Sequence, residues 1–128
     1  MAVPLVNYLA LDGAPHLMAT QCDSCGAKYF DRRNACASCG GTSFHQSAVP
    51  TTGVIRAFTI VSLAAPGIPV PFVAAVVDCG GTSVRANIIN VPPDADHVRL
   101  GMNVKLVTYS LGADDSGTEA IGFGFEPV

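Results

Sequence analysis

Charged side chains are scarce in this chain, and their scarcity argues against binding to nucleic acid. Only 13% of the 128 residues are charged, against roughly 25% in ordinary soluble domains, while 49% are hydrophobic. Seven basic residues stand against ten acidic ones, and no basic run is longer than Arg32-Arg33. Binding to a nucleic-acid backbone needs a positive stripe that this sequence lacks, so we expect no nucleic-acid partner. A surface this poor in charge favours a protein partner.

The sequence also lacks the patterns of export, membrane insertion and catalysis. Residues 1–10 contain no basic side chain, which argues against a signal peptide. Residues 57–77 carry no charge, but the prolines and glycine in their middle would break a membrane helix. Two strands and a loop fit this stretch better, and no membrane contact is expected.

The three histidines are scattered and belong to no nucleophile or metal motif, so no catalytic residue is predicted.

What the sequence does have is two closely spaced cysteine pairs. Cys22-x2-Cys25 and Cys36-x2-Cys39 are each followed by a glycine, which suits the positive φ of a tight turn. Four thiolates at this spacing are the ligand set of a structural zinc site, which leaves no coordination position for water or substrate. Free buried thiols, a disulfide and an iron site of the rubredoxin type are the alternatives, but iron-binding pairs usually lie much further apart. A reduced thiol set indicates a cytoplasmic protein.

After Thr42 the pattern changes to short β-runs with turns between them. The predicted fold class is mainly β, with an N-terminal arm and rubredoxin-like zinc ribbon in residues 1–48 and a five-stranded OB-fold barrel in residues 49–128. Gly80-Gly81 reads as a two-residue hairpin turn between two of the strands. The barrel strands are predicted at residues 54–62, 72–79, 82–90, 104–111 and 119–125.

The remaining segments are less regular. Residues 3–11 predict a short helix or an extended arm, which is too short to be stable without docking on the rest of the chain. A small hairpin around the first cysteine pair is predicted from residues 16–21 and 28–30. A lead-in to the barrel is predicted at residues 42–49. Residues 91–99 lie where many such barrels have a helix, but they are too few for more than one turn.

The linker between the two cysteine pairs is a candidate binding patch. Residues 28–33 hold three of the seven basic residues beside two aromatics, and metal turns on both sides would make them rigid. An anionic, adenine-bearing ligand such as CoA could bind there through phosphate contact and ring stacking. Alternatively, the aromatics pack the ribbon against the barrel and the arginines are solvated. The residues concerned are Lys28, Tyr29, Phe30, Arg32 and Arg33.

An apolar loop stiffened by proline, residues 64–71, is the second candidate surface. Its side chains would lose little entropy on binding, whereas leaving them in water is unfavourable. We expect the loop to contact a partner subunit or an apolar substrate, the alternative being a loop folded over the barrel mouth. The residues concerned are Pro66, Ile68, Pro69, Val70 and Pro71.

Together these motifs resemble one known family. The pattern is a CxxCG…CxxCG ribbon with an aromatic-Asp-Arg-Arg linker, followed by an OB-type barrel with Gly-Met before its fourth strand. Over residues 5–128 it is similar to the acyl-CoA-associated zinc-ribbon/OB-fold proteins, long catalogued as a domain of unknown function. Residues 32–36, 53–59 and 117–125 look most like the companion of steroid side-chain-cleaving aldolases. Asp31 stands where family members often carry proline.

The resemblance implies an accessory subunit that pairs with a thiolase-like catalytic subunit in an α2β2-type hetero-oligomer, or is joined to an acyl-CoA hydratase-type domain. Zinc would be structural, and a CoA thioester would be the substrate of the complex. The implied reaction is retro-aldol cleavage of a β-hydroxyacyl-CoA in a steroid side chain, releasing propionyl-CoA, with this chain docking the partner and helping to form its acyl-CoA site. Two alternatives stay open: the companion of a thiolase or acyltransferase, and an OB-fold binder of single-stranded nucleic acid.

Overall fold

The computed structural model describes residues 2–128, which form ten β-strands and no helix. None of these residues therefore belongs to a helix that is long and apolar enough to cross a membrane. The strands are β1 (Ala2–Pro4), β2 (Leu9–Ala10), β3 (His16–Cys22), β4 (Lys28–Tyr29), β5 (Phe44–Val49), β6 (Thr52–Val61), β7 (Phe72–Cys79), β8 (Thr82–Ile88), β9 (Asn103–Ala113) and β10 (Glu119–Pro127).

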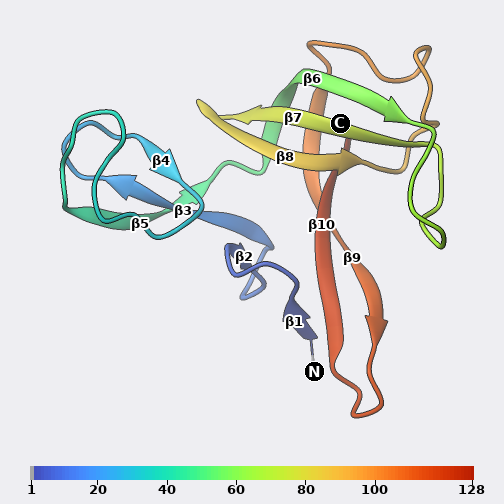
Figure 1. Ribbon diagram of the computed structural model, residues 1–128, viewed down its shortest axis with the longest axis horizontal. Helices are drawn as coiled ribbons and strands as arrows, with labels where there is room; N and C mark the ends of the chain where they lie inside the picture. Colours follow the sequence, from blue (N-terminus) through green and yellow to red (C-terminus); the bar gives the residue numbers. More distant parts are fainter. Residues whose placement is uncertain (1) are drawn as a thin grey trace.

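Five of the strands close into a barrel, the body at the upper right of Figure 1. The strand order is β6-β7-β8-β10-β9, and β9 pairs back with β6. Neighbouring strands are antiparallel except β8 and β10, which run parallel with Phe125 opposite Ile88. This is the strand arrangement of an OB-fold. The predicted fold class is confirmed, and each predicted barrel strand is present with both ends within two residues of their predicted positions.

Alternation along β7 accounts for much of the barrel core. Every second side chain, at Val73, Ala75, Val77 and Cys79, is buried, whereas those between them are only half-buried on the outer side. The hairpin from β7 to β8 turns at Gly80-Gly81, whose φ angles of 64° and 94° lie in the left-handed region that glycine adopts without strain. The local pattern of strand, glycine turn and strand therefore produces this pairing directly.

A β-bulge in β6 decides which side chains of that strand enter the core. The pairing with β7 shifts register between Ile55 and Ala57, which is the signature of one extra residue on one strand. Simple alternation from the buried Ile55 would place Ala57 inside the barrel. Because of the bulge, Phe58 and Ile60 pack against the core instead, and Ala57 faces outward.

A second sheet, made of short strands, forms the ribbon. β3 pairs antiparallel with β2, β4 and β5, and the predicted β3–β4 hairpin is present. Residues 42–49 do contain a strand, but the prediction that they lead into the barrel is wrong, because β5 pairs with β3. This pairing places the buried Val49 opposite the buried Leu17, which covers apolar surface that a free lead-in would expose. The division of the chain at residues 48 and 49 stays a prediction.

Residues 3–11 form an extended arm and not a helix. Within the arm, β1 lies parallel to β10 and β2 pairs with β3, so both short strands are stabilised by sheets that they join. Ala2–Pro4 runs opposite Glu119–Ile121, in the part of the β9–β10 hairpin that projects below the barrel in Figure 1. The arm thereby connects the ribbon sheet to the barrel. Residues 91–99 hold a single hydrogen-bonded turn, in which the Val98 N–H donates to the Asp94 carbonyl oxygen, as the length of the segment predicted.

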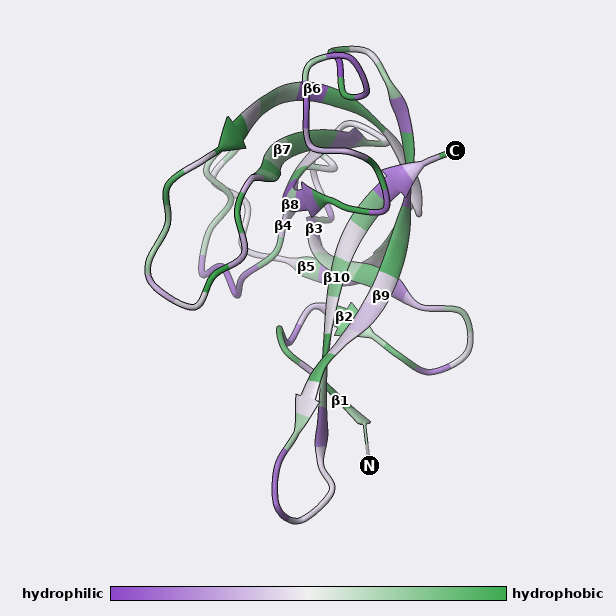
Figure 2. Ribbon diagram, turned by 90° about the vertical axis from the view of Figure 1, so that its right-hand side faces the viewer, coloured by the Kyte–Doolittle hydropathy of each residue, from purple (hydrophilic) through white to green (hydrophobic). Residues whose placement is uncertain are grey.

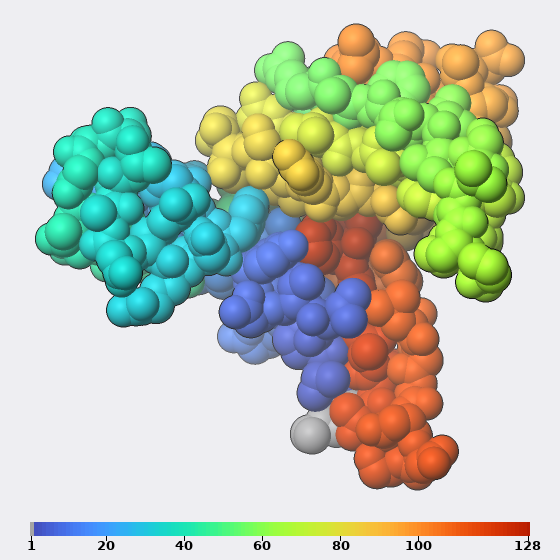
Figure 3. All heavy atoms as spheres, viewed as in Figure 1, coloured from blue at the N-terminus to red at the C-terminus, as the bar shows by residue number. Residues whose placement is uncertain are grey.

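Aromatic side chains join the ribbon to the barrel. Figure 3 shows the ribbon as a lobe at the left of the molecule. Phe30 of the linker lies against Tyr8 of the arm, with ring centroids 4.9 Å apart, and Tyr8 meets Phe123 of β10 edge-on at 5.9 Å. Phe123 in turn meets the buried Phe125 at 6.4 Å. Pairs of this kind contribute roughly 0.5–1.5 kcal/mol each beyond area burial, so they hold the lobe in place.

Replacement of Val77 by Ala tests the assignment of inner and outer sides in β7. Val77 is 0% exposed, so Val77→Ala should lower the free energy of unfolding by about 2 kcal/mol through lost burial and a residual cavity. Val76→Ala, on the outer side of the same strand, is the matched control and should cost less than about 1 kcal/mol. Urea unfolding in zinc-containing buffer measures both values, and equal losses would contradict the assignment.

Candidate functional site

Both cysteine pairs fold into the same tight turn. In the first pair the Gly26 N–H donates to the Cys22 carbonyl oxygen at 3.0 Å, and in the second the Gly40 N–H donates to the Cys36 carbonyl oxygen at 2.8 Å. The two glycines have φ angles of 80° and 78°, the left-handed conformation that the sequence pattern predicted. The two turns are therefore equivalent in geometry, and each directs two sulfurs toward the same point.

The four cysteine sulfurs gather in one cluster. They lie within 4.8 Å of one another, with 3.6 Å between the sulfurs of Cys22 and Cys39 and 3.5 Å between those of Cys25 and Cys36. A tetrahedral zinc ion with bonds of about 2.3 Å holds its sulfur ligands about 3.8 Å apart, so the observed spacing fits zinc. Gly41 packs directly on this cluster, since a Cβ there would lie 3.4 Å from two of the sulfurs. The geometry supports the predicted structural zinc.

Tyr29 ties the linker to the second cysteine pair. Its hydroxyl lies 3.4 Å from Cys36 Sγ and accepts a hydrogen bond from the Ala37 N–H at 3.1 Å. The Ser38 N–H is also 3.4 Å from the same sulfur. The hydrogen bond from Tyr29 is the largest of the effects that lower the pKa of Cys36 to about 6. Cys36 is therefore readily deprotonated, as a zinc ligand must be.

The other sulfurs show why the cluster suits a cation. The Gly41 N–H lowers the pKa of Cys39, but the neighbouring sulfurs, Cys25 and Cys22 foremost, outweigh it and raise that pKa to about 12. The pKa of Cys22 is lowered by the backbone N–H groups of Cys25 and Ser24. Thiols this close together cannot all lose their protons unless a positive charge compensates them, and a bound zinc ion supplies that charge.

A polar cluster beside the first cysteine pair was not predicted. Asp23, between Cys22 and Cys25, accepts a hydrogen bond from the Ser43 hydroxyl at 2.5 Å and also contacts Nδ1 of His45. The bond from Ser43, followed by that from His45, lowers the pKa of the Asp23 carboxyl. These contacts tie β5 to the first turn. The sequence carries no local signal for them, because the pairing of β3 with β5 brings together residues that are 20 and 22 positions apart.

Three of the five residues predicted to bind CoA line one hollow. Phe30, Arg32 and Arg33 help to line a hollow of about 420 Å³ between the linker, the arm and strands β3 and β5. Lys28 and Tyr29 lie outside that lining, and Tyr29 faces the sulfurs instead. Phe30 packs on Tyr8 of the arm, whereas the alternative interpretation of the linker expected both aromatics to pack the ribbon against the barrel. CoA binding at these residues stays a prediction.

The two linker arginines differ in how far they are already engaged. The Arg33 guanidinium lies 4.4 Å from the centre of the Tyr29 ring, and its Nε is 3.2 Å from an Asp31 carboxylate oxygen. Arg32 is exposed and has no ion pair in the part of the chain that the structure describes. Of the two linker arginines, Arg32 is therefore the one that an incoming anion can reach without displacing an existing contact.

The proline-stiffened loop between β6 and β7 is open to solvent. Ile68 is 50% exposed and Val70 43%, and the preceding Leu63 is 90% exposed. The side chains predicted to meet a partner or substrate are all exposed: Pro66, Ile68, Pro69, Val70 and Pro71. Their contact with a partner stays a prediction.

Comparison with known proteins identifies both parts of the chain. Residues 13–45 match the family described as "ChsH2, rubredoxin-like zinc ribbon domain", and residues 46–109 match "ChsH2, C-terminal OB-fold domain". A solved structure described as "Ltp2-ChsH2(DUF35) aldolase" is similar, with a TM-score of 0.66 and 24% sequence identity over 88% of this chain and 84% of that chain. At this identity the likeness shows a shared fold. No curated protein matches the chain significantly.

Cys36→Ser tests the structural role of the metal cluster. The substitution leaves three sulfur ligands, so zinc affinity should fall roughly a hundredfold or more and the ribbon should lose its order, because metal-binding energy is folding energy in such modules. Cys79→Ala is the matched control, since Cys79 is buried in the barrel and should leave one zinc per chain. Zinc content after dialysis against a chelator measures the effect. Full zinc retention by Cys36→Ser would disprove the assignment.

Tyr29→Phe tests the hydrogen bond to Cys36. Removing the hydroxyl that supports a ligand typically lowers metal affinity about tenfold, and we expect that loss here. Tyr8→Phe is the control, because the Tyr8 ring packs on Phe30 and Phe123 and its hydroxyl makes no hydrogen bond that the structure records. Competition with a chromophoric chelator gives both affinities. If the two variants bind zinc equally well, Tyr29 does not support the metal.

Proposed function

The chain belongs to the ChsH2 family, in which a rubredoxin-like zinc ribbon precedes an OB-fold domain, and on that premise we propose that it is the companion subunit of an aldolase complex. The observation that carries this proposal is the match of two consecutive parts of the chain to the two ChsH2 domains in the expected order. The similar solved structure bears a name that couples ChsH2 with an aldolase. The four-sulfur cluster fits this role, because a closed zinc site stabilises the ribbon and does no chemistry on a substrate.

The catalytic partner in this proposal is a thiolase-like subunit, and the substrate is a β-hydroxyacyl-CoA. A base on the partner removes the proton of the β-hydroxyl, the Cα–Cβ bond breaks as a carbonyl forms at Cβ, and the bonding electron pair passes to the thioester as an enolate. Protonation of the enolate gives propionyl-CoA when the substrate is the side chain of a steroid. The other product is the ring ketone.

The contribution of this chain would be to dock the partner and to complete its acyl-CoA site. Exposed apolar side chains in the β6–β7 loop offer contact area that is unfavourable in water, with Leu63 90% exposed and Ile68 50% exposed. Arg32 and the 420 Å³ hollow beside it are the candidate contact for the phosphates of CoA. A complex with two copies of each subunit, or one that includes an acyl-CoA hydratase-type domain, is part of the same proposal.

The outer face of the barrel argues against single-stranded nucleic acid as the ligand. OB-folds that bind nucleic acid stack bases on aromatic side chains of the β-strands. The outward positions at the centre of β7 and β8 are Ala74, Val76, Arg85 and Asn87, which offer no aromatic ring. The net charge of −3 also opposes backbone binding.

Co-expression tests the proposed function. A tagged form of this chain should co-purify with a co-expressed thiolase-like protein, and the complex should convert a β-hydroxyacyl-CoA to propionyl-CoA without consuming free CoA. Product formation that requires free CoA would favour the alternative, a companion of a thiolase or acyltransferase. Absence of any complex, with the chain monodisperse by light scattering, would contradict both.

Arg32→Ala tests the predicted CoA contact within that complex. Loss of one exposed ion pair to a phosphate, worth roughly 1 kcal/mol, should raise the KM for the acyl-CoA about fivefold and leave kcat unchanged. Arg99→Ala, which removes an exposed arginine distant from the linker in the sequence, is the matched control. Because Arg33 packs on Tyr29, Arg32 is the cleaner position to change. Equal KM values for wild type and Arg32→Ala would mean that Arg32 is merely solvated.

A further inference from the structure

Two rows of outward-facing side chains cross the barrel strands β6, β7 and β8. In the first row Ala57 lies beside Val76, and Val76 lies beside Arg85. In the second row Thr59 lies beside Ala74, and Ala74 lies beside Asn87. Directly opposed residues on neighbouring strands are in side-chain contact range, so the six residues form one continuous surface.

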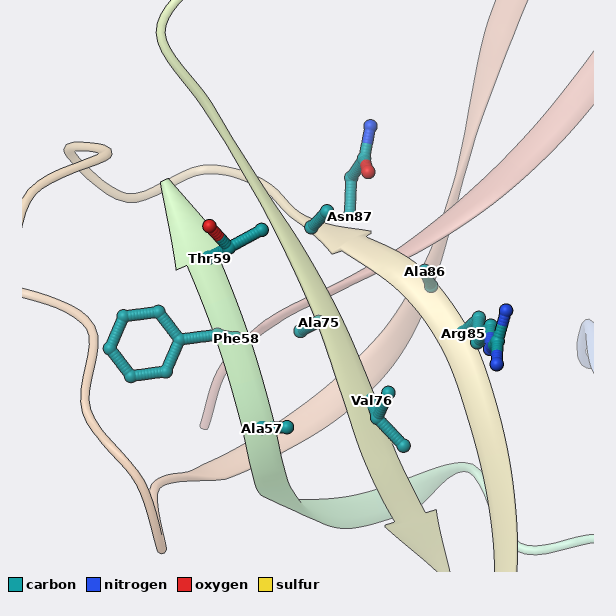
Figure 4. A pocket seen from close by; sticks show the side chains of 9 residues that line it. Ala57, Phe58, Thr59, Ala75, Val76, Arg85, Ala86 and Asn87 are labelled. Carbon is teal, nitrogen blue, oxygen red and sulfur yellow. The ribbon is translucent and has the colours of Figure 1, made fainter. Parts of the chain in front are cut away.

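This surface is hollowed. The two alanines are short, whereas the side chains around them are longer, and together they bound an open hollow of about 530 Å³. Figure 4 shows Ala57 and Thr59 on β6 and Arg85 and Asn87 on β8, with Val76 of β7 between the two strands. A volume of roughly 300–1,000 Å³, lined mostly by apolar atoms with a few polar groups at the edge, is typical of a small-molecule site.

The sequence of β7 shows that the outer side of this strand is apolar as well as the inner side. A strand with one face in solvent normally alternates apolar and polar residues, whereas a strand covered on both faces reads as a continuous apolar run. β7 reads FVAAVVDC, with no polar residue before Asp78, and Figure 2 colours much of it as hydrophobic. The outer face of β7 therefore has the composition of a covered surface.

The charged groups around the hollow define the kind of molecule that fits. Arg85 is exposed and makes no ion pair or side-chain hydrogen bond within residues 2–128. The nearest other arginine along this face, Arg56, is already paired with Asp78 at 3.4 Å. Arg85 thus offers an unpaired cation at the edge of an apolar floor, with the Asn87 amide on the same strand as a second donor.

We infer that this hollow binds a small organic anion with an apolar body, the hydrocarbon lying over Ala57, Ala74 and Val76 and the anionic group meeting Arg85. The floor spans two strand spacings, about 10 Å, which a medium-length hydrocarbon chain or a fused-ring body can cover. The inference does not rest on the proposed function, because binding requires only this chain.

The first experiment uses the zinc-loaded full chain and the fluorescent probe 1-anilinonaphthalene-8-sulfonate, which combines an aromatic body with an anionic group. We expect saturable binding of one probe per chain, and displacement of the probe by decanoate more readily than by decanol. Arg85→Gln should weaken decanoate binding about fivefold, as expected for one exposed charge-assisted contact, and leave decanol binding unchanged. Equal effects on decanoate and decanol would overturn the role of Arg85.

The second experiment tests the floor of the hollow with two charge-matched variants. Ala74→Glu places a carboxylate in the hollow, where it fills space and competes for Arg85, and should weaken probe binding at least tenfold. Asn103→Glu adds the same charge at an exposed position of β9 outside the lining and away from β8, and should change probe affinity less than twofold. If both variants weaken binding equally, or if the wild-type chain binds no probe saturably, the inference is wrong. Co-purification with a catalytic partner is unaffected by that outcome, so the two proposals can fail separately.

Discussion

The convergence of four cysteine thiolates on one cation is the constraint on which the order of the ribbon and its linker depends. The ribbon has few buried side chains of its own, and two of them, Cys22 and Cys36, belong to the four-sulfur cluster. β4 is only two residues long, which is too short for it to be stable as an independent strand. The free energy of zinc binding is therefore folding free energy for this part of the chain. The contact of the Tyr29 hydroxyl with Cys36 connects the cluster to the linker. The hydrogen bond that Asp23 accepts from Ser43 connects the first cysteine turn to the start of β5.

An ordered ribbon in turn positions the surfaces on which the proposed function depends. Phe30 can meet Tyr8 because the linker is anchored at both ends by the cysteine turns, and the aromatic contacts continue into the barrel at Phe125. These contacts hold the linker against the barrel, which also carries the β6–β7 loop and the outer face of β7. A companion subunit gains from this arrangement, because surfaces that are already rigid lose little entropy when a partner or ligand binds.

Local patterns in the sequence were sufficient to predict the five barrel strands, the β3–β4 hairpin and the cluster of four cysteines. Gly80-Gly81 and the alternation along β7 specify a hairpin within a few residues, and the cysteine spacing specifies the ligand turns. Features that depend on distant contacts were not predictable. The pairing of β5 with β3 and of β1 with β10 joins segments far apart in the chain. The bulge after Ile55 reverses the inner and outer sides of β6, so the hollow could not be foreseen from alternation.

Amide hydrogen exchange with and without a zinc chelator tests the central claim most directly. The account predicts that chelation raises exchange throughout β3, β4 and β5 and in the linker, while the amides of β7 and β8 stay protected, because the barrel has its own core. Unchanged protection of the ribbon strands after zinc has been removed would contradict the account.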